Sequence, residues 1–343
     1  MNLISENRFS EIVNKFTSID PILVLGDVGV DKYTLGDVRR ISPEAPVPIL
    51  EVQKEWEKLG LAANVADNLI GLGIKTNLCG VIGDDNNGRV FEELLAKSGL
   101  SLQALIKAYD RKTTYKERVL TNTQQICRID YETLVDISSD TKAEIFKKVD
   151  SFINNHEAII IQDYGKGMIT KNLCEIVIKK FKDAGKIVLV DPYRTTPPEF
   201  YTNATLLKPN KLEALQLIDS LGYKGEKNIS TIAKILIEKL KLEQIIITLG
   251  AEGMGLIDLK AGGNYEVIPT IASEVFDVSG AGDTAASTIV ASLVAGASLV
   301  EAAWVGNCAS GVVVGKKGTA RVYLDELKQF YQSSIIKLNK SKK

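Results

Sequence analysis

The sequence of 343 residues predicts an α/β protein: a doubly wound, mostly parallel sheet flanked by helices, with a small antiparallel β-sheet lid. Six short runs are apolar almost throughout, which is typical of strands buried on both faces of a parallel sheet. Longer amphipathic stretches alternate with these runs, as repeated βα units require. The composition, 45% hydrophobic and 25% charged, is ordinary for a globular protein with a large core.

The predicted strands are the apolar runs at residues 22–25, 76–80, 158–161, 187–190, 206–207 and 245–248. The predicted helices lie at 61–72, 86–97, 140–155, 171–184, 211–219, 229–241, 284–297 and 300–315. Because no internal repeat or low-complexity linker divides the chain, we expect residues 1–343 to form one domain around one core.

Two segments interrupt the βα alternation. Residues 32–54 and 112–131 alternate polar and apolar side chains with period two, and Pro43, Pro46 and Pro48 exclude a helix from the first. We expect both to form antiparallel strands with one solvent-exposed face, inserted into the α/β core. Such a sheet would act as a lid that excludes water from the substrate. The alternative is that these segments are ordinary edge strands.

Charge and cysteine usage exclude several classes of function. A net charge of −1 gives no electrostatic basis for nucleic-acid binding. The four cysteines are widely spaced and His156 is the only histidine, so a zinc site is not expected. Cys79 and Cys308 stand in apolar contexts and are predicted to be buried in a reducing compartment. With no signal-peptide pattern and no long apolar window, we expect a cytoplasmic protein without a membrane partner.

The stretch Asp277-Val-Ser-Gly-Ala-Gly-Asp283 is the most informative motif. Its glycines allow a tight turn directly before a predicted helix, whose first N–H groups and macrodipole favour an anion. Asp283 lies inside this anion site, which suggests a base that deprotonates a hydroxyl while the amides of Gly280, Ala281 and Gly282 hold a migrating phosphoryl group. The motif therefore points to phosphoryl transfer.

Two alternative interpretations of the motif exist. The segment is also compatible with a simple loop in which Asp283 caps the helix. It satisfies the loose dinucleotide fingerprint G-x-G-x-x-A as well, with Glu301 at about the spacing of a ribose ligand. In dinucleotide-binding proteins the acidic ribose ligand ends the strand that follows the glycine-rich helix. Residues 284–297 and 300–315 both have helical patterns instead, so the context disfavours a dinucleotide-dependent hydride-transfer enzyme.

Beyond this motif, the chain resembles the ribokinase (PfkB-type) carbohydrate kinases along nearly its whole length. The resemblance rests on residues 277–283 and on Gly60-Leu-Ala-Ala-Asn64. Within the family the chain is most similar to the kinases of D-glycero-D-manno-heptose 7-phosphate, through the strings 26–33, 40–48 and 163–167. This resemblance implies an enzyme that transfers the γ-phosphoryl group of ATP, with Mg²⁺, to the C1 hydroxyl of that sugar in ADP-heptose synthesis.

The resemblance also implies roles for individual residues. Asp283 would be the general base, and the amides of residues 280–282 would stabilise the γ-phosphoryl oxygens. Asp31 would accept hydrogen bonds from sugar hydroxyls, and Gly60 and Asn64 would belong to the sugar-binding loop. Asp31 is also compatible with a turn residue and Asn64 with a helix cap. Asn210 and Glu213 would organise Mg²⁺ through water, although the same pair fits a helix capping box. The nucleotide-binding positions implied are Asn210, Glu213, Thr248, Gly250, Gly253, Asn307 and Gly311. For the last two, close helix packing is an alternative.

A phosphorylated sugar requires cations near the lid. Arg118 and Lys166 are the two we expect to bind the sugar phosphate, ahead of three further cations in the same segments, Arg40, Lys116 and Arg128. Each alone is also compatible with a solvated surface charge.

Departures from the family pattern leave the sugar open. Leu61 replaces a glycine, Gly29 replaces a bulky residue, and Tyr193-Arg194 follows Asp191-Pro192 where relatives have Lys-Gly. Alternatives are therefore a kinase of another sugar or sugar phosphate, and a sugar-sensing protein without catalysis. By analogy we also expect a homodimer through the lid, activation by a monovalent cation, and the nucleotidyltransferase activity of fused relatives on another polypeptide.

Overall fold

The computed structural model describes residues 4–271, 276–316 and 318–340. Within them, a nine-stranded sheet has the order β13-β12-β11-β10-β9-β8-β1-β4-β5. Its strands are β1 (Ile22–Gly26), β4 (Thr76–Gly83), β5 (Leu105–Ala108), β8 (Ala158–Gln162), β9 (Ile187–Asp191), β10 (Leu206–Leu207), β11 (Gln244–Thr248), β12 (Met254–Asp258) and β13 (Tyr265–Ile268). All neighbours are parallel except β11–β12 and β12–β13. The predicted fold class is confirmed.

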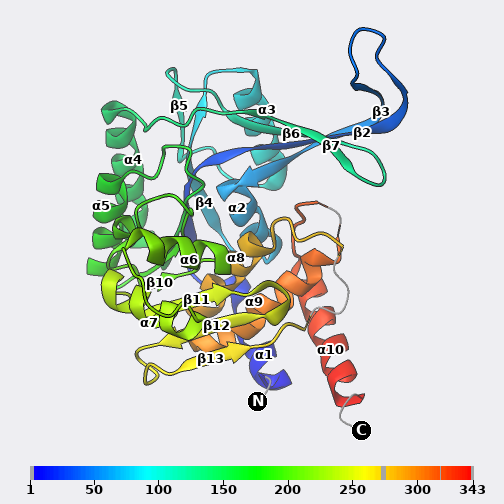
Figure 1. The fold of residues 1–343 in the computed structure, drawn as a ribbon. Helices are drawn as coiled ribbons and strands as arrows, with labels where there is room; N and C mark the ends of the chain where they lie inside the picture. Colours follow the sequence, from blue (N-terminus) through cyan, green and yellow to red (C-terminus); the bar gives the residue numbers. More distant parts are fainter. Residues whose placement is uncertain (1–3, 272–275, 317, 341–343) are drawn as a thin grey trace.

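Helices cover both faces of this sheet (Figure 1). One face packs against α1 (Glu6–Asn14), α2 (Ala62–Gly71), α3 (Asn86–Ser98), α8 (Ala281–Val294), α9 (Leu299–Val314) and α10 (Leu324–Lys340). The other packs against α4 (Ser139–Phe152), α5 (Lys171–Asp183), α6 (Lys211–Ser220) and α7 (Ile229–Leu240). Along β1, Ile22 and Val24 enter the first core and Leu23 and Leu25 enter the second. Burial on both faces explains the continuously apolar sequence of such strands.

A second sheet of four strands projects from the body of the molecule (Figure 1). It has the order β3-β2-β6-β7, with β2 (Val28–Ile41), β3 (Pro48–Leu61), β6 (Thr114–Leu120) and β7 (Gln125–Tyr131). We call it the lid sheet. The prediction that it is wholly antiparallel is wrong, because β2 and β6 are parallel.

The parallel pairing in the lid sheet follows from the main sheet. β2 continues from β1, and β6 follows β5 after a short loop. Since β1 and β5 belong to the parallel part of the main sheet, both segments leave it at the same edge and in the same direction. The returning strands β3 and β7 then pair antiparallel with β2 and β6.

Several smaller expectations can be compared with the fold. Cys79 and Cys308 are buried as predicted. His156 is buried, with one ring nitrogen 2.9 Å from the Phe152 carbonyl oxygen and the other 3.0 Å from Asn77 Oδ1, so its contacts are structural. No helix in the described part of the chain is long and apolar enough to cross a membrane.

Candidate active site

The polar side chains that follow the parallel strands converge at one edge of the main sheet. Gln162 ends β8, Asp191 ends β9, Lys208 follows β10 and Thr248 ends β11. The carboxyl ends of parallel strands meet at the same edge, where α/β proteins place their ligands. The first turn of α8 lies against this edge and carries Asp283.

Asp283 is held by side chains from three different elements. Asn64 Nδ2, on α2, donates to Asp283 Oδ2 at 2.7 Å. The Tyr164 hydroxyl donates to Asp283 Oδ1 at 2.6 Å, and Gln162 Nε2 lies 3.3 Å from the same oxygen. Burial raises the pKa of Asp283 to about 6, and the hydrogen bonds from Tyr164 and Asn64 oppose the rise. The carboxyl group is therefore mostly ionised at neutral pH and able to accept a proton.

The glycine loop forms a left-handed turn that starts α8. Gly280 is the N-cap residue, with φ of 80°, a conformation that glycine adopts without strain. The Ala281 N–H donates to the Val278 carbonyl at 3.2 Å, so this amide is already used within the turn. Among the described residues, the backbone N–H groups of Gly280 and Gly282 have no acceptor. Those two amides are available to an anion.

Lys208 adds a buried positive charge that the sequence analysis did not identify. Its side chain is 3% exposed, and its Nζ lies 2.9 Å from Asp191 Oδ2. A Cβ at Gly282 would lie only 3.8 Å from that Nζ, which places the ammonium group against the glycine loop. Burial acts to lower the pKa of Lys208, but the charge of Asp191 outweighs it and the pKa is raised. A cation fixed here suits a phosphoryl group held by the loop.

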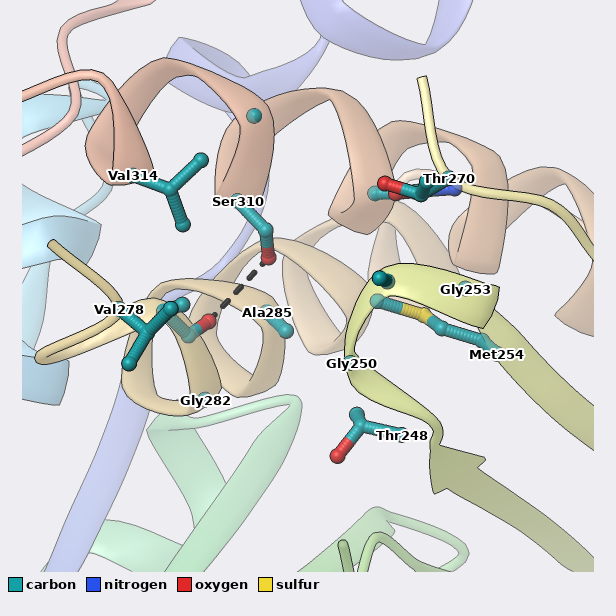
Figure 2. A pocket seen from close by; sticks show the side chains of 14 residues that line it. Thr248, Gly250, Gly253, Met254, Thr270, Val278, Gly282, Ala285, Ser310 and Val314 are labelled. Atoms are coloured by element: carbon teal, nitrogen blue, oxygen red, sulfur yellow. Dashed lines mark hydrogen bonds between the residues drawn. The ribbon is translucent and has the colours of Figure 1, made fainter. Parts of the chain in front are cut away.

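A pocket of about 300 Å³ opens beside the glycine loop, between α8, α9 and the turn after β11 (Figure 2). Five of the predicted nucleotide-binding residues line it: Thr248, Gly250, Gly253, Asn307 and Gly311. Ala281 and Gly282 of the glycine loop line it as well. Ser310 Oγ donates to the Ala281 carbonyl at 3.2 Å, which ties α9 to the loop (Figure 2).

Three of these pocket residues also have structural roles. Gly253 has φ of 100°, and a Cβ there would lie 2.0 Å from the Ile268 carbonyl oxygen, so only glycine fits the turn. Asn307 Nδ2 donates to the Pro269 carbonyl at 2.7 Å. A Cβ at Gly311 would lie 2.4 Å from the Phe330 ring. Asn307 and Gly311 thus serve helix and loop packing as well as facing the pocket.

Asn210 and Glu213 form the capping box that was the alternative to a magnesium motif. Asn210 Oδ1 accepts the Glu213 N–H at 2.9 Å, and Glu213 Oε2 accepts the Asn210 N–H at 2.8 Å. Burial, with the nearby charge of Asp191, raises the pKa of Glu213 to about 7. The oxygen donors of this pair fit Mg²⁺, which needs few protein ligands when phosphates and water supply the rest.

No group of three or more His, Cys, Asp or Glu side chains in the described part of the chain is arranged to hold a metal ion alone. Asn210 lies next to the pocket beside the glycine loop, because it pairs with the pocket residue Thr248 in an isolated parallel bridge. The capping box and a water-mediated contact to Mg²⁺ are compatible, since each carboxylate oxygen accepts more than one hydrogen bond.

The predicted sugar ligands lie where the lid sheet joins the core. Asp31 on β2 is buried, and its Oδ1 accepts a hydrogen bond from Arg118 Nη1 at 2.6 Å. A Cβ at Gly60 would lie 2.9 Å from Asp31 Oδ2, so the glycine leaves room for that carboxylate. Asn64 lies in the first turn of α2, just after the end of β3, and contacts Asp283. The structure thus connects Asp31, Gly60 and Asn64 to the proposed base through consecutive elements.

The two faces of the lid sheet differ in charge. Residues paired across strands point to the same face, so the register places Asp31, Lys58, Lys116, Arg118, Arg128 and Asp130 on one face, which we call the inner face. Lys32, Glu55, Glu57 and Glu117 lie on the opposite, outer face. The inner face contacts the core, because Lys58 Nζ donates to the Thr319 carbonyl at 2.5 Å. Four cations of the lid sheet therefore lie on its inner face, whereas three of the four charged residues named on its outer face are acidic.

Lys166 extends this cationic region from the core side. It is buried in the loop after β8, and its Nζ lies 2.7 Å from Glu132 Oε2. Lys116 Nζ lies 3.8 Å from the same oxygen. Arg128 instead pairs with Asp130 at 2.9 Å, and Arg40 is exposed towards the far end of β2. Of the cations considered from the sequence, the structure gathers Lys116, Arg118 and Lys166 near the core.

Leu61, which replaces a glycine of the family pattern, has a glycine-like backbone. It joins β3 to α2 with φ of 57° and ψ of −137°, a region that costs a non-glycine residue about 1–3 kcal/mol. We expect Leu61→Gly to raise the free energy of unfolding by about 1 kcal/mol, because relief of strain exceeds the greater chain entropy of glycine. Urea denaturation measures the change. Leu61→Ala keeps the Cβ and therefore the backbone strain. Equal stabilisation by Leu61→Ala and Leu61→Gly would contradict the interpretation that strain at this position lowers stability.

Comparisons with known proteins agree with this geometry. A family profile described as pfkB family carbohydrate kinase matches residues 33–326. A bifunctional protein HldE of Sulfurimonas denitrificans is 38% identical over 95% of this chain, and one of Desulfatibacillum aliphaticivorans is 40% identical over 97%. In both cases the match covers 67% of the relative, so this chain spans about two thirds of their length.

Solved structures share the fold. Arabidopsis thaliana ribokinase complexed with ribose and ATP aligns with a TM-score of 0.71 and 21% identity, over 91% of this chain and 98% of the other. Escherichia coli phosphofructokinase-2 in complex with potassium aligns with a TM-score of 0.74 and 17% identity, over 92% and 99%. The fold, the family profile and the extended sequence identity together show that the chain belongs to the pfkB family of carbohydrate kinases.

Proposed function

We propose that this enzyme transfers the γ-phosphoryl group of ATP to the C1 hydroxyl of D-glycero-D-manno-heptose 7-phosphate, giving the 1,7-bisphosphate. The observation that carries the proposal is the arrangement around Asp283: an ionisable carboxylate at an anion-binding helix start, between a nucleotide-sized pocket and a cationic lid face. The heptose follows from the HldE relatives and from the strings at 26–33, 40–48 and 163–167.

In the proposed reaction, Asp283 takes the proton of the acceptor hydroxyl group. The oxygen of that hydroxyl group bonds to the γ-phosphorus, and the bond between the γ-phosphorus and the bridging oxygen of ADP breaks. The amides of Gly280 and Gly282 and the ammonium group of Lys208 stabilise negative charge on the transferred group. Asn210 and Glu213 would hold Mg²⁺ through water, and the bound ion would neutralise charge on the nucleotide phosphates. Adenosine binds beside Gly253 and Asn307.

The lid sheet supplies the proposed specificity for a phosphorylated sugar. We place the sugar hydroxyls near Asp31 and Asn64, and the 7-phosphate near the inner-face cations and Lys166. Arg118 is already held by Asp31, so it is oriented before substrate binds. An arginine fork then binds phosphate with two hydrogen bonds. Exposed Ile41, Val47 and Val52 at the far end of the lid sheet fit pairing with the lid of a second copy.

The test measures ADP release with Mg·ATP and each of four acceptors: heptose 7-phosphate, fructose 6-phosphate, fructose 1-phosphate and ribose. Arg118→Met is expected to raise KM for heptose 7-phosphate by about 10- to 100-fold, because a charge-assisted hydrogen-bond pair to phosphate is lost. KM for an unphosphorylated sugar should change much less. Lys32→Met removes a cation from the adjacent position on the outer face and serves as the matched control.

The possible outcomes separate the alternatives. Preference for heptose 7-phosphate, with the Arg118→Met effect confined to phosphorylated sugars, supports the proposal. Faster turnover of fructose 6-phosphate than of heptose 7-phosphate would support a sugar-phosphate kinase but reject heptose 7-phosphate as its substrate. Turnover of ribose alone would reject the assignment of the inner face as the binding site for the sugar phosphate. Equal effects of Arg118→Met and Lys32→Met on KM would reject it as well. ATP binding without turnover of any acceptor would favour a sugar-sensing protein.

A further inference from the structure

The hydroxyl group of Tyr164 makes the shortest hydrogen bond to the Asp283 carboxylate, at 2.6 Å. Tyr164 lies 119 residues before Asp283 in the sequence and reaches it from the loop after β8. Gln162 Nε2 lies 3.3 Å from both the phenol oxygen and Asp283 Oδ1, and it also donates to Asp191 Oδ2 at 3.0 Å. One carboxylate oxygen of Asp283 is therefore fixed from the core sheet, while Asn64 fixes the other from α2.

The loop that carries Tyr164 is itself firmly anchored. The carboxylate of Asp27, buried after β1, accepts hydrogen bonds from the backbone N–H groups of Tyr164 at 3.0 Å, Lys166 at 3.1 Å and Met168 at 3.2 Å. Gly165 has φ of 65°, and a Cβ there would lie 2.4 Å from the Tyr193 ring. The phenol is thus held at a defined place, as a residue that orients a reacting group must be.

We propose that Tyr164 is a positioning residue: its hydroxyl holds Asp283 in the orientation and the ionised form in which it accepts the proton of the sugar hydroxyl. This inference rests on the proposed role of Asp283 as the base. An ionised carboxylate offers about four acceptor positions. Asn64, Tyr164 and Gln162 use three, which leaves one for the acceptor hydroxyl.

Tyr164 is suited to donate a hydrogen bond to Asp283 and not to take the proton of the acceptor hydroxyl itself. Burial and the charge of Asp283 raise the pKa of Tyr164 well above its ordinary value, so the phenol stays protonated throughout the working range. The other groups whose charges act on Asp283 are Asp191, which raises its pKa, and Lys208, which lowers it. Asp191 ends β9 and Lys208 follows β10, so Tyr164→Phe changes neither charge.

The experiment measures kcat and KM from pH 5 to 9 for wild type and Tyr164→Phe, with the sugar that the acceptor panel identifies. The base acts in its ionised form, so kcat rises with pH through its pKa. Loss of a hydrogen bond to the charged form raises that pKa. We expect the acid limb of the kcat profile to move upward by about one pH unit, with KM for ATP unchanged.

Tyr201→Phe is the matched control. Tyr201 is also buried, and its hydroxyl donates to a carboxylate of the same region, Asp163 Oδ2, at 2.7 Å, without touching Asp283. We expect this variant to keep the wild-type acid limb. An unmoved limb in Tyr164→Phe would overturn the inference, as would equal shifts in both variants. A higher KM for the sugar without a shift would also overturn it, because Tyr164 would then act as a sugar ligand.

Asp283→Asn separates failure of this inference from failure of the proposed function. If Asp283→Asn keeps turnover, the base is wrongly assigned and the role of Tyr164 falls with it. If Asp283→Asn is inactive but Tyr164→Phe keeps the wild-type profile, the proposed function stands and only the positioning role is rejected. An inactive Asp283→Asn together with an upward shift in Tyr164→Phe supports both.

Discussion

Replacement of Asp283 by asparagine is expected to lower kcat by about 10³-fold, within the range that a positioned general base contributes. Asparagine has nearly the same shape but cannot take the proton of the acceptor hydroxyl. Its amide oxygen can accept a hydrogen bond but its NH₂ group cannot, so the variant no longer accepts from both Asn64 and Tyr164. Steady-state ADP release measures kcat, and any residual rate should lose the acid limb near pH 6 that the raised pKa of Asp283 predicts.

Binding and folding controls complete this test. Asp283 does not line the proposed nucleotide pocket, so the affinity of Asp283→Asn for ATP should remain close to that of wild type. A thermal unfolding curve verifies that the variant is folded. If the folded variant keeps more than a tenth of wild-type kcat, another group must accept the proton.

The second large effect is expected for Lys208→Met. This substitution leaves Asp191 as an uncompensated buried charge, which costs about 3–5 kcal/mol of stability. It also removes the cation beside Gly282, and loss of such stabilisation lowers kcat by about 10²- to 10³-fold. Urea denaturation and ADP release measure the two effects separately.

The double variant Lys208→Met with Asp191→Asn distinguishes the effect on stability from the effect on catalysis. It removes both members of the buried ion pair and leaves no buried charge at that place, so most of the lost stability should return. Activity should stay low, because the cation beside the glycine loop is still absent. Recovery of activity together with stability would mean that Lys208 serves only the fold.

The sequence was sufficient for the architecture because the relevant signal is local. Runs such as Ile159, Ile160 and Ile161 are apolar on both faces, and this pattern alone identifies a buried parallel strand. β5, β12 and β13 and the terminal helices α1 and α10 were not predicted. β5 and β13 have only four residues and lie at the two edges of the sheet, where one-sided exposure weakens the pattern.

The candidate site was predictable where motifs are contiguous and not where it depends on contacts between distant segments. The glycine loop and the asparagine–glutamate pair are recognisable by spacing, and five of the seven nucleotide positions line one pocket. Tyr164, Gln162 and Lys208 acquire their roles only when β8 and β10 are placed beside α8. A lysine or tyrosine after a strand carries no signal of that placement. Similarly, Asp31 and Arg118 were each expected to bind sugar, but their ion pair follows from the parallel β2–β6 register.

The lid sheet also has a consequence for the order of folding. Its two hairpins, β2–β3 and β6–β7, are separated in sequence by α2, β4, α3 and β5. The first hairpin can form from local contacts as soon as it is synthesised. The parallel β2–β6 pair requires segments about 85 residues apart to meet, which slows its formation. Until then the β2 edge that later pairs with β6 has no partner strand and is open to pairing with another chain. The surface proposed to select the substrate is therefore assembled late in folding.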